Sequence, residues 1–152
     1  MSFNKQIKNF NNKTQRAANA VFRGTALSLF GKIVKRTPVG NPSTWKGKAP
    51  KGYTGGRLRA NWQVQINTPA DGEIDRQDKN GGSTINNGHA NMARAEIGDS
   101  IFITNNLPYA DAIENGRSGQ APSGMVKVTI AESQHIVATK AKQERKRVYL
   151  LI

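Results

Sequence analysis

The feature that most constrains the fold is a long amphipathic pattern over residues 5–36. Apolar residues recur in it at the spacing of a helix with about 3.6 residues per turn. They are Ile7, Phe10, Ala17, Val21, Leu29 and Ile33, and the later turns add Phe22, Ala26, Phe30 and Val34. Pro38 ends the element, because the residue before a proline avoids helical angles. The pattern predicts one helix that is unusually long for a chain of 152 residues.

Residues 38–56 contain three prolines and five glycines, which leave no room for a regular element. Three lysines, Lys46, Lys48 and Lys51, alternate there with the aromatic residues Trp45 and Tyr53. Basic residues interleaved with aromatic ones can hold single-stranded nucleic acid, whose bases stack on the rings. A long surface loop anchored by one aromatic ring explains the same pattern, and we favour that interpretation.

Residues 58–66 alternate between apolar and polar side chains and predict a strand. In that strand Leu58, Ala60, Trp62, Val64 and Ile66 would face the core, and Arg59, Asn61, Gln63 and Gln65 would point outward. A polar, acidic stretch over 67–83 follows, and we expect it to be a loop or an irregular hairpin. Residues 84–96 are then expected to form a short helix that starts at Ser83 or Thr84.

The apolar run over 100–104 predicts a second strand, buried on both faces. Asn105 or Asn106 is expected to take a positive φ and end it. A short helix is expected from Pro108 to Glu114, because proline suits the first turn and Asn115–Gly116 can end the element.

A last helix is expected from about Gly124 to Glu144, with Ser123 as its N-terminal cap. Its apolar side would consist of Val126, Ile130, Ile136 and Val137. The final five residues, VYLLI, are apolar and β-prone, so we expect them to pair with the chain's own sheet or with a neighbouring molecule.

These elements predict a single α+β domain over residues 1–152. A small, mostly antiparallel sheet would be packed by a long N-terminal helix and a C-terminal helix, with a long loop at 38–56 and a polar excursion at 67–83. No apolar run approaches the roughly 20 residues that span a bilayer. Residues 1–10 lack the apolar block of a signal peptide, so we expect neither membrane insertion nor secretion.

The charge is distributed very unevenly along the chain. Residues 1–70 carry 13 basic residues and no acidic one, residues 71–139 have a net charge of −4, and residues 140–152 have a net charge of +4. A one-sided distribution creates a field that attracts acidic partners. Nucleic acid and an acidic protein surface both fit such a field.

The sequence contains no recognisable catalytic or cofactor-binding constellation. It has no cysteine and only two histidines, His89 and His135, neither of which has a metal-ligand partner three or four residues further on. Glu132 precedes His135 by three residues, and we interpret this pair as a surface pair. Asp71, Glu73, Asp75 and Asp78 alternate as an acidic cluster, but an EF-hand loop would need a Glu where Gly82 stands. We therefore expect no enzyme, no bound metal and no cofactor, and interpret the acidic cluster as a solvated loop.

Four stretches of the chain resemble the minor tail component family of tailed bacteriophages, the neck or tail-completion proteins of lambdoid siphophages. They are KRTPVG (35–40), TGGRLRANWQ (54–63), IFITNNLPYADAIENG (101–116) and GQAPSGMVKVTIAE (119–132). The resemblance covers most of the chain except its extreme ends and residues 67–92. Shorter family members join the first two stretches by a tight Asp-Thr-Gly link, whereas Gly40 to Tyr53 are inserted here. We expect most residues of these stretches to serve the core and the helix caps.

The resemblance implies a virion structural protein without catalytic residues, which assembles as a homo-oligomeric ring where head meets tail. Its partners would be neighbouring neck, connector or tail-tube proteins, and it would reside in the host cytoplasm during assembly and then in the virion. The residues expected to contact these partners or packaged double-stranded DNA are Lys46, Lys48, Lys51, Arg57, Arg59 and Tyr109. Two alternatives stay open, a tail terminator-type ring protein and a basic protein that binds nucleic acid without sequence preference.

Overall fold

The fold is described from a computed structural model, which covers residues 2–44, 47–49 and 51–149. Its spine is helix α1, Phe3–Arg36, which confirms the expected long helix and begins two residues earlier than residue 5. The helix ends at Thr37, whose extended backbone turns the chain toward Pro38. The described part of the following loop contains one short 3-10 turn, η1, at Pro42–Thr44.

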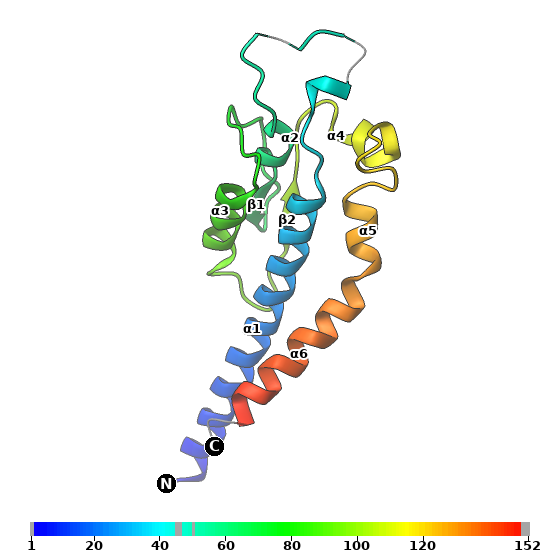
Figure 1. The fold of residues 1–152 in the computed structure, drawn as a ribbon. Helices are drawn as coiled ribbons and strands as arrows, with labels where there is room; N and C mark the ends of the chain where they lie inside the picture. Colours follow the sequence, from blue (N-terminus) through cyan, green and yellow to red (C-terminus); the bar gives the residue numbers. More distant parts are fainter. Residues whose placement is uncertain (1, 45–46, 50, 150–152) are drawn as a thin grey trace.

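Two layers flank α1, as Figure 1 shows. On one side of its C-terminal half lie strands β1 (Gln63–Ile66) and β2 (Ile101–Thr104) with helix α3 (Gly82–Met92). On the other side helices α5 (Val126–Ala131) and α6 (Ser133–Tyr149) run back toward the start of α1. The two strands pair antiparallel with Gln63 opposite Thr104. This arrangement confirms the predicted α+β fold.

The hydrophobic core lies between α1, the sheet and α3, and extends to the start of α5. Its fully or largely buried members are Ala26, Phe30, Ile33, Val34, Leu58, Trp62, Val64, Met92, Leu107, Ala110, Ala121 and Met125. Phe30 is completely buried, and its ring lies directly against Gly88 of α3. A Cβ atom at position 88 would overlap this ring, so only glycine lets α3 approach α1 so closely.

The expected strand over 58–66 is only half correct. Its first part is the helical turn α2, Arg57–Ala60, and only β1 is extended. Gly55 and Gly56 adopt positive φ angles of 80° and 87°, which direct the chain into a helical turn. The prediction that Leu58, Ala60, Trp62 and Val64 are buried is confirmed, because a helical turn followed by a strand can bury the same residues.

The second strand is confirmed in position, but its expected burial on both faces is wrong. All four residues of β2 are half-buried. Ile101 and Ile103 pack against the core, and strand alternation directs Phe102 and Thr104 to the opposite face. The sheet has two strands in the described structure, and its core-facing side alone packs against the helices.

The short helix after β2 is confirmed in outline as α4, Ala110–Ala112, which widens into a π-helical turn, η2, at Ile113–Arg117. Gly116 ends it with a φ of 88°, as its place in the sequence predicts. The expected positive φ at Asn105 or Asn106 is wrong, because Asn67 is the one non-glycine residue with positive φ in the described part of the chain.

The last helix departs most from expectation, since the predicted helix from Gly124 to Glu144 is broken at Glu132 into α5 and α6. Ile130 and Val137, expected on its apolar side, are exposed. Val148 and Tyr149 are helical, so the expected strand at the C-terminus is wrong for these two residues, and Leu150 to Ile152 lie outside the described residues. Among the described helices, none combines the length and apolar character needed to cross a bilayer.

Candidate assembly surfaces

The stretches that resemble the phage family fasten the elements of the fold to one another. Thr37, in the first stretch, accepts a hydrogen bond at its Oγ1 from the indole Nε1 of Trp62, in the second, at 2.7 Å. Thr37 Oγ1 also donates to the carbonyl of Ile33 at 2.7 Å. The end of α1 is thereby tied to the start of β1 through two buried side chains.

Arg59, one of the predicted partner contacts, is half-buried and also holds the end of α1. Its guanidinium donates to the Thr37 carbonyl at 2.6 and 3.1 Å and to the Lys35 carbonyl at 3.2 Å. It also donates to the Lys79 carbonyl. Carbonyl groups at the end of a helix lack partners within the helix, and Arg59 supplies donors to them. Burial lowers the pKa of Arg59, against the opposing effect of Asp78.

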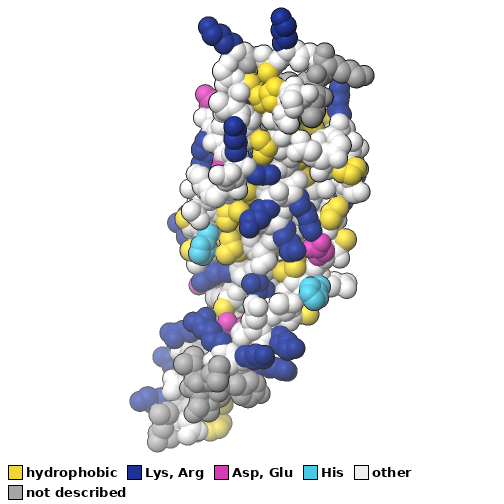
Figure 2. All heavy atoms as spheres, in the orientation of Figure 1, with side chains coloured by type: hydrophobic (Ala, Val, Ile, Leu, Met, Phe, Trp, Pro, Cys, Tyr) yellow, Lys and Arg dark blue, Asp and Glu magenta, His cyan; other side chains and the backbone are white. Residues whose placement is uncertain are grey.

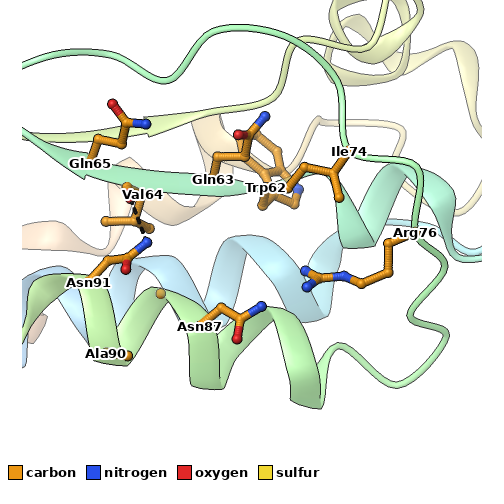
Figure 3. A pocket seen from close by; sticks show the side chains of 10 residues that line it. Trp62, Gln63, Val64, Gln65, Ile74, Arg76, Asn87, Ala90 and Asn91 are labelled. Atoms are coloured by element: carbon orange, nitrogen blue, oxygen red, sulfur yellow. Dashed lines mark hydrogen bonds between the residues drawn. The ribbon is translucent and has the colours of Figure 1, made fainter.

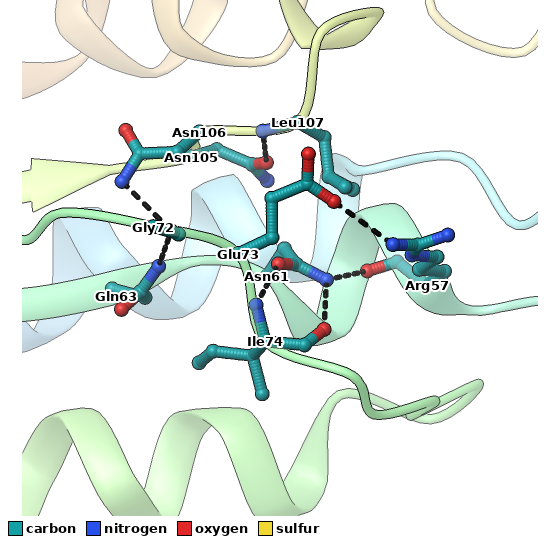
Figure 4. A network of polar contacts seen from close by, with 9 residues as sticks. All are labelled: Arg57, Asn61, Gln63, Gly72, Glu73, Ile74, Asn105, Asn106 and Leu107. Atoms are coloured by element: carbon teal, nitrogen blue, oxygen red, sulfur yellow. Dashed lines mark hydrogen bonds and ion pairs between the residues drawn. The ribbon is translucent and has the colours of Figure 1, made fainter.

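Asn61 and Asn106 brace the loop that follows β1 against the rest of the domain, and Asn105 ties the end of β2 to α2 (Figure 4). Asn61 donates to the carbonyls of Arg57 and Ile74 at 2.9 Å and accepts from the Ile74 amide at 2.7 Å. Asn105 donates to the Leu58 carbonyl at 2.9 Å. Asn106 donates to the carbonyls at the start of the loop, Ala70 at 2.9 Å and Gly72 at 3.0 Å. The asparagines after β2 thus act through their side-chain amides.

Glu114 caps helix α5, a role that the sequence suggested for Ser123. Its carboxylate accepts hydrogen bonds from the backbone amides of Met125, Val126 and Lys127 at 2.7, 2.9 and 2.9 Å. Burial works to raise the pKa of Glu114, but these three hydrogen bonds outweigh it and hold the pKa below its usual value. A carboxylate at a helix N-terminus accepts hydrogen bonds from amides that have no partner within the helix, and its negative charge interacts favourably with the positive end of the helix dipole.

Four of the remaining predicted contact residues, Lys48, Lys51, Arg57 and Tyr109, are described by the structure and lie toward the end of the molecule where the 38–56 loop is found. Lys48 and Lys51 are exposed there, and Lys46 lies outside the described residues. Arg57 is exposed and pairs with Glu73 at 2.8 Å. Tyr109 is exposed as well, and partial burial raises its pKa. The structure therefore brings Arg57 and Tyr109 to one surface, whereas the guanidinium of Arg59 is engaged with backbone carbonyls.

The alternating acidic cluster separates into residues with different structural roles. Asp78 accepts from the amides of Gly81 and Thr84 at 2.8 Å each, and it caps the start of α3. Burial works to raise the pKa of Asp78, but the hydrogen bonds from Thr84 and Gly81 outweigh burial and hold the pKa below its usual value. Glu73 pairs with Arg57. Over the described residues, no three His, Asp or Glu side chains come together in a way that could hold a metal ion.

The hollow between β1 and α3 is small and does not combine reactive groups (Figure 3). Its volume is about 260 Å³, and its lining includes Trp62, Val64, Arg76, Asn87 and Asn91. Arg76 points into it, and its guanidinium donates to the Ala60 carbonyl at 3.2 Å. Typical ligand pockets are larger, at about 300–1,000 Å³. We assign no chemistry to this hollow.

The N-terminal end of α1 exposes three large apolar side chains, two of which, Ile7 and Phe10, the sequence pattern assigns to the buried stripe. Phe3, Ile7 and Phe10 have 73%, 46% and 66% of their surface exposed. Every residue from Ser2 to Arg16 is exposed, so this part of the helix protrudes from the domain. We call residues 3–16 the α1 arm. Apolar side chains exposed together mark an interaction site in a soluble protein.

The α1 arm is also basic, and it lies beside a second basic segment. Lys5, Lys8, Lys13 and Arg16 belong to it, and Lys142, Arg145, Lys146 and Arg147 belong to the adjacent end of α6. Figure 1 shows the two termini at the same end of the molecule, and Figure 2 shows lysine and arginine side chains crowded there. The sequence revealed both basic clusters, but not that antiparallel packing of α1 and α6 joins them.

Comparison with known proteins found no match: no family model matches the chain, and no curated protein or solved structure is significantly similar to it. The resemblance to the minor tail component family accordingly stays a prediction that depends on the four sequence stretches.

Proposed function

We propose that the protein is a virion structural protein, a subunit of a ring at the head–tail junction of a tailed bacteriophage. The four stretches that resemble the minor tail component family support the proposal from the sequence. The observation that carries it is the α1 arm, whose apolar side chains Phe3, Ile7 and Phe10 the described domain leaves exposed. A ring subunit needs adhesive surfaces that its own fold leaves uncovered.

The frame of the domain suits a role in assembly. Buried or half-buried polar residues, among them Thr37, Arg59 and Glu114, fasten α1 to β1 and η2 to α5. The domain is therefore a rigid spacer, with the α1 arm at one end and the 38–56 loop at the other (Figure 1). Lys48 and Lys51 are exposed on that loop. A spacer with adhesive groups at both ends can connect two neighbouring components of a particle.

A second candidate function is binding of nucleic acid without sequence preference, and the basic end formed by the α1 arm and α6 favours it. Such binding would be strongly salt-dependent, because each lysine or arginine that contacts a phosphate releases condensed counterions. Non-specific binders typically have a Kd of about 10⁻⁴ to 10⁻⁶ M at physiological salt. Sub-micromolar affinity for short duplexes at about 150 mM salt would favour this candidate over the ring subunit.

The proposal is tested by deleting the gene in its parent phage or prophage and imaging the induced lysate by electron microscopy. Full heads beside separate tails of normal length are expected for a protein of the head–tail junction. Tails of abnormal length would indicate the terminator-type ring instead. Intact, infectious particles would contradict a structural role and leave nucleic-acid binding as the candidate.

A further inference from the structure

One face of α1 carries a seam in which the spacing alternates between four and three residues. Its members are Phe3, Ile7, Phe10, Thr14, Ala17, Val21, Gly24, Ser28 and Gly31. This spacing is typical of helices that pair side by side. Before Thr14 the seam consists of large apolar residues, and after Thr14 most of its members are small. We call its first three members the open seam.

Helix α6 covers the later part of the seam. Lys32, next to the seam, lies 2.8 Å from Glu132 at the α5–α6 junction. A Cβ atom on Gly24 would come within 3.5 Å of the Lys140 side chain. Gly24 therefore lies on the face of α1 that α6 covers.

The open seam continues the same face beyond the described end of α6. At about 3.6 residues per turn, Thr14 lies about five turns from Lys32 on the same side of α1, and Phe10 and Ile7 lie about one and two turns further. Lys140 lies level with Gly24, and α6 continues for nine residues beyond it to Tyr149. Because the two helices run antiparallel, nine residues along α6 correspond to nine residues back along α1, so α6 reaches the level of Gln15. The exposure of every residue from Ser2 to Arg16 agrees with this geometry.

We propose that the open seam pairs, antiparallel, with the open seam of a second copy of this chain. The seam spacing fits a helix as occupant, and α1 itself is a helix with large apolar residues at that spacing. In the antiparallel arrangement Ile7 of each copy meets Phe10 of the other. A two-fold contact of this kind is self-complementary. The inference goes beyond the proposed function and does not depend on it.

The polar residues of the α1 arm favour a second copy over an acidic partner. The positions that flank the open seam carry Asn4, Gln6, Asn11 and Lys13, so a single charge lies beside the contact. Lys5, Lys8 and Arg16 fall on the opposite face of the helix, away from it. Neutral amides demand no carboxylate from the partner, and they can donate to and accept from the same amides of a second copy.

Charge also decides between the parallel and antiparallel arrangements. Lys142, Arg145 and Arg147 crowd the end of α6, close to the α1 arm. A parallel pair would bring two such basic ends together, whereas an antiparallel pair keeps them at opposite ends of the contact. Because each copy carries a net charge of +13, we expect pairing to strengthen as salt screens the repulsion. Binding of an acidic partner would weaken with salt.

The test uses the absence of cysteine in the sequence, which makes an introduced cysteine the only thiol. Ile7→Cys and Phe10→Cys proteins are purified separately, mixed and oxidised at high salt. The antiparallel pair predicts that disulfides between the two different variants form in preference to disulfides between two copies of the same variant.

Sedimentation of the cysteine-free protein measures self-association directly. Phe3→Ser/Ile7→Ser/Phe10→Ser should weaken this association by at least about tenfold, because it removes the apolar side chains of the contact. Ile130→Ser, at another exposed apolar site, is the matched control and should have no effect.

Several outcomes would overturn the inference. A monomer at all accessible concentrations and salt conditions excludes a second copy as the occupant. If Ile7→Cys proteins form disulfides mainly with other Ile7→Cys proteins, the pair is parallel. If the triple serine variant associates as strongly as the wild type, the copies contact each other through another surface. Binding of the α1 arm to phosphatidylglycerol vesicles by a protein that stays monomeric would identify a membrane surface as the occupant. The gene deletion is a separate test, because it asks whether the particle needs the protein at all and not which molecule the open seam contacts.

Discussion

The indole Nε1 of Trp62 donates a 2.7 Å hydrogen bond to Oγ1 of Thr37. Thr37 is completely buried at the end of α1, and Trp62 is buried directly before β1. The bond joins two sequence stretches that are separated by the 38–56 loop. It therefore fixes the angle between the long helix and the sheet independently of the length of that loop.

Thr37→Val should lower the free energy of unfolding by about 1–3 kcal/mol, because it leaves a buried indole N–H without an acceptor. In a Trp62→Phe background the same substitution should cost less, since no N–H is then left unpaired. Urea unfolding of the two single variants and the double variant measures this coupling. Equal costs of Thr37→Val in both backgrounds would show that the bond does not stabilise the fold.

Arg59→Met and Arg57→Met form a matched pair on one helical turn. We expect Arg59→Met to cost about 1–3 kcal/mol, because it removes the donors that satisfy the Thr37 and Lys35 carbonyls. Arg57→Met removes an exposed ion pair with Glu73 and should cost less than about 1 kcal/mol. Thermal or urea unfolding distinguishes the two. If Arg57→Met proved the more costly, our division of these residues into surface and structural would be wrong.

The pair also illustrates what the sequence could and could not predict. Alternation over residues 58–66 identified the buried apolar side chains Leu58, Ala60, Trp62 and Val64, because burial depends on apolar character and spacing. It wrongly placed Asn61 outward, since Asn61 is completely buried, and Ile66 is only half-buried. It could not distinguish a strand from a helical turn followed by a strand. The role of Arg59 was hidden because its acceptors are backbone carbonyls more than 20 residues away, which no sequence pattern marks.

Glu114→Gln should lower the free energy of unfolding at pH 7 by about 1–2 kcal/mol, because it weakens the cap on α5. The folded-state pKa of Glu114 lies below its unfolded value. Its stabilisation is thus present at neutral pH and is lost as the pH falls below the ordinary glutamate pKa of about 4.3 and through the lower folded-state pKa. Unfolding curves across this range should converge for the wild type and the variant. Glu96→Gln, at an exposed position, is the control, and curves that stay apart at low pH would contradict the ionised cap.

Gly88→Ala should destabilise the protein by about 1–3 kcal/mol, because its Cβ would overlap the ring of Phe30 and force α3 away from α1. Gly31→Ala is the control within α1, where a Cβ atom has open space. It should stabilise the protein by up to about 1 kcal/mol, since alanine is the better helix former. Differential scanning calorimetry can measure both changes. An unchanged transition for Gly88→Ala would mean that the two helices are less tightly packed than described.

The α1 arm shows a second limit of prediction from sequence. The helix over 5–36 could be predicted within two residues, because its periodicity is a local property of the chain. The expectation that Ile7 and Phe10 belong to the buried stripe is wrong. Periodicity reports which side chains share a face, and whether that face is covered depends on how far α6 extends along α1. That extent depends on the break at Glu132 and the direction of α6, which are properties of tertiary packing.

The most direct test of the central claim is complementation of the phage deletion with Phe3→Ser/Ile7→Ser/Phe10→Ser. These side chains are exposed, so the free energy of unfolding should change by no more than about 0.5 kcal/mol. We expect the wild-type gene to restore joined heads and tails and an infectious titre, and the folded triple variant to leave them separate. A full titre from the triple variant would contradict the assignment of the α1 arm as an assembly surface. Normal particles from the deletion itself would contradict a structural role in the virion.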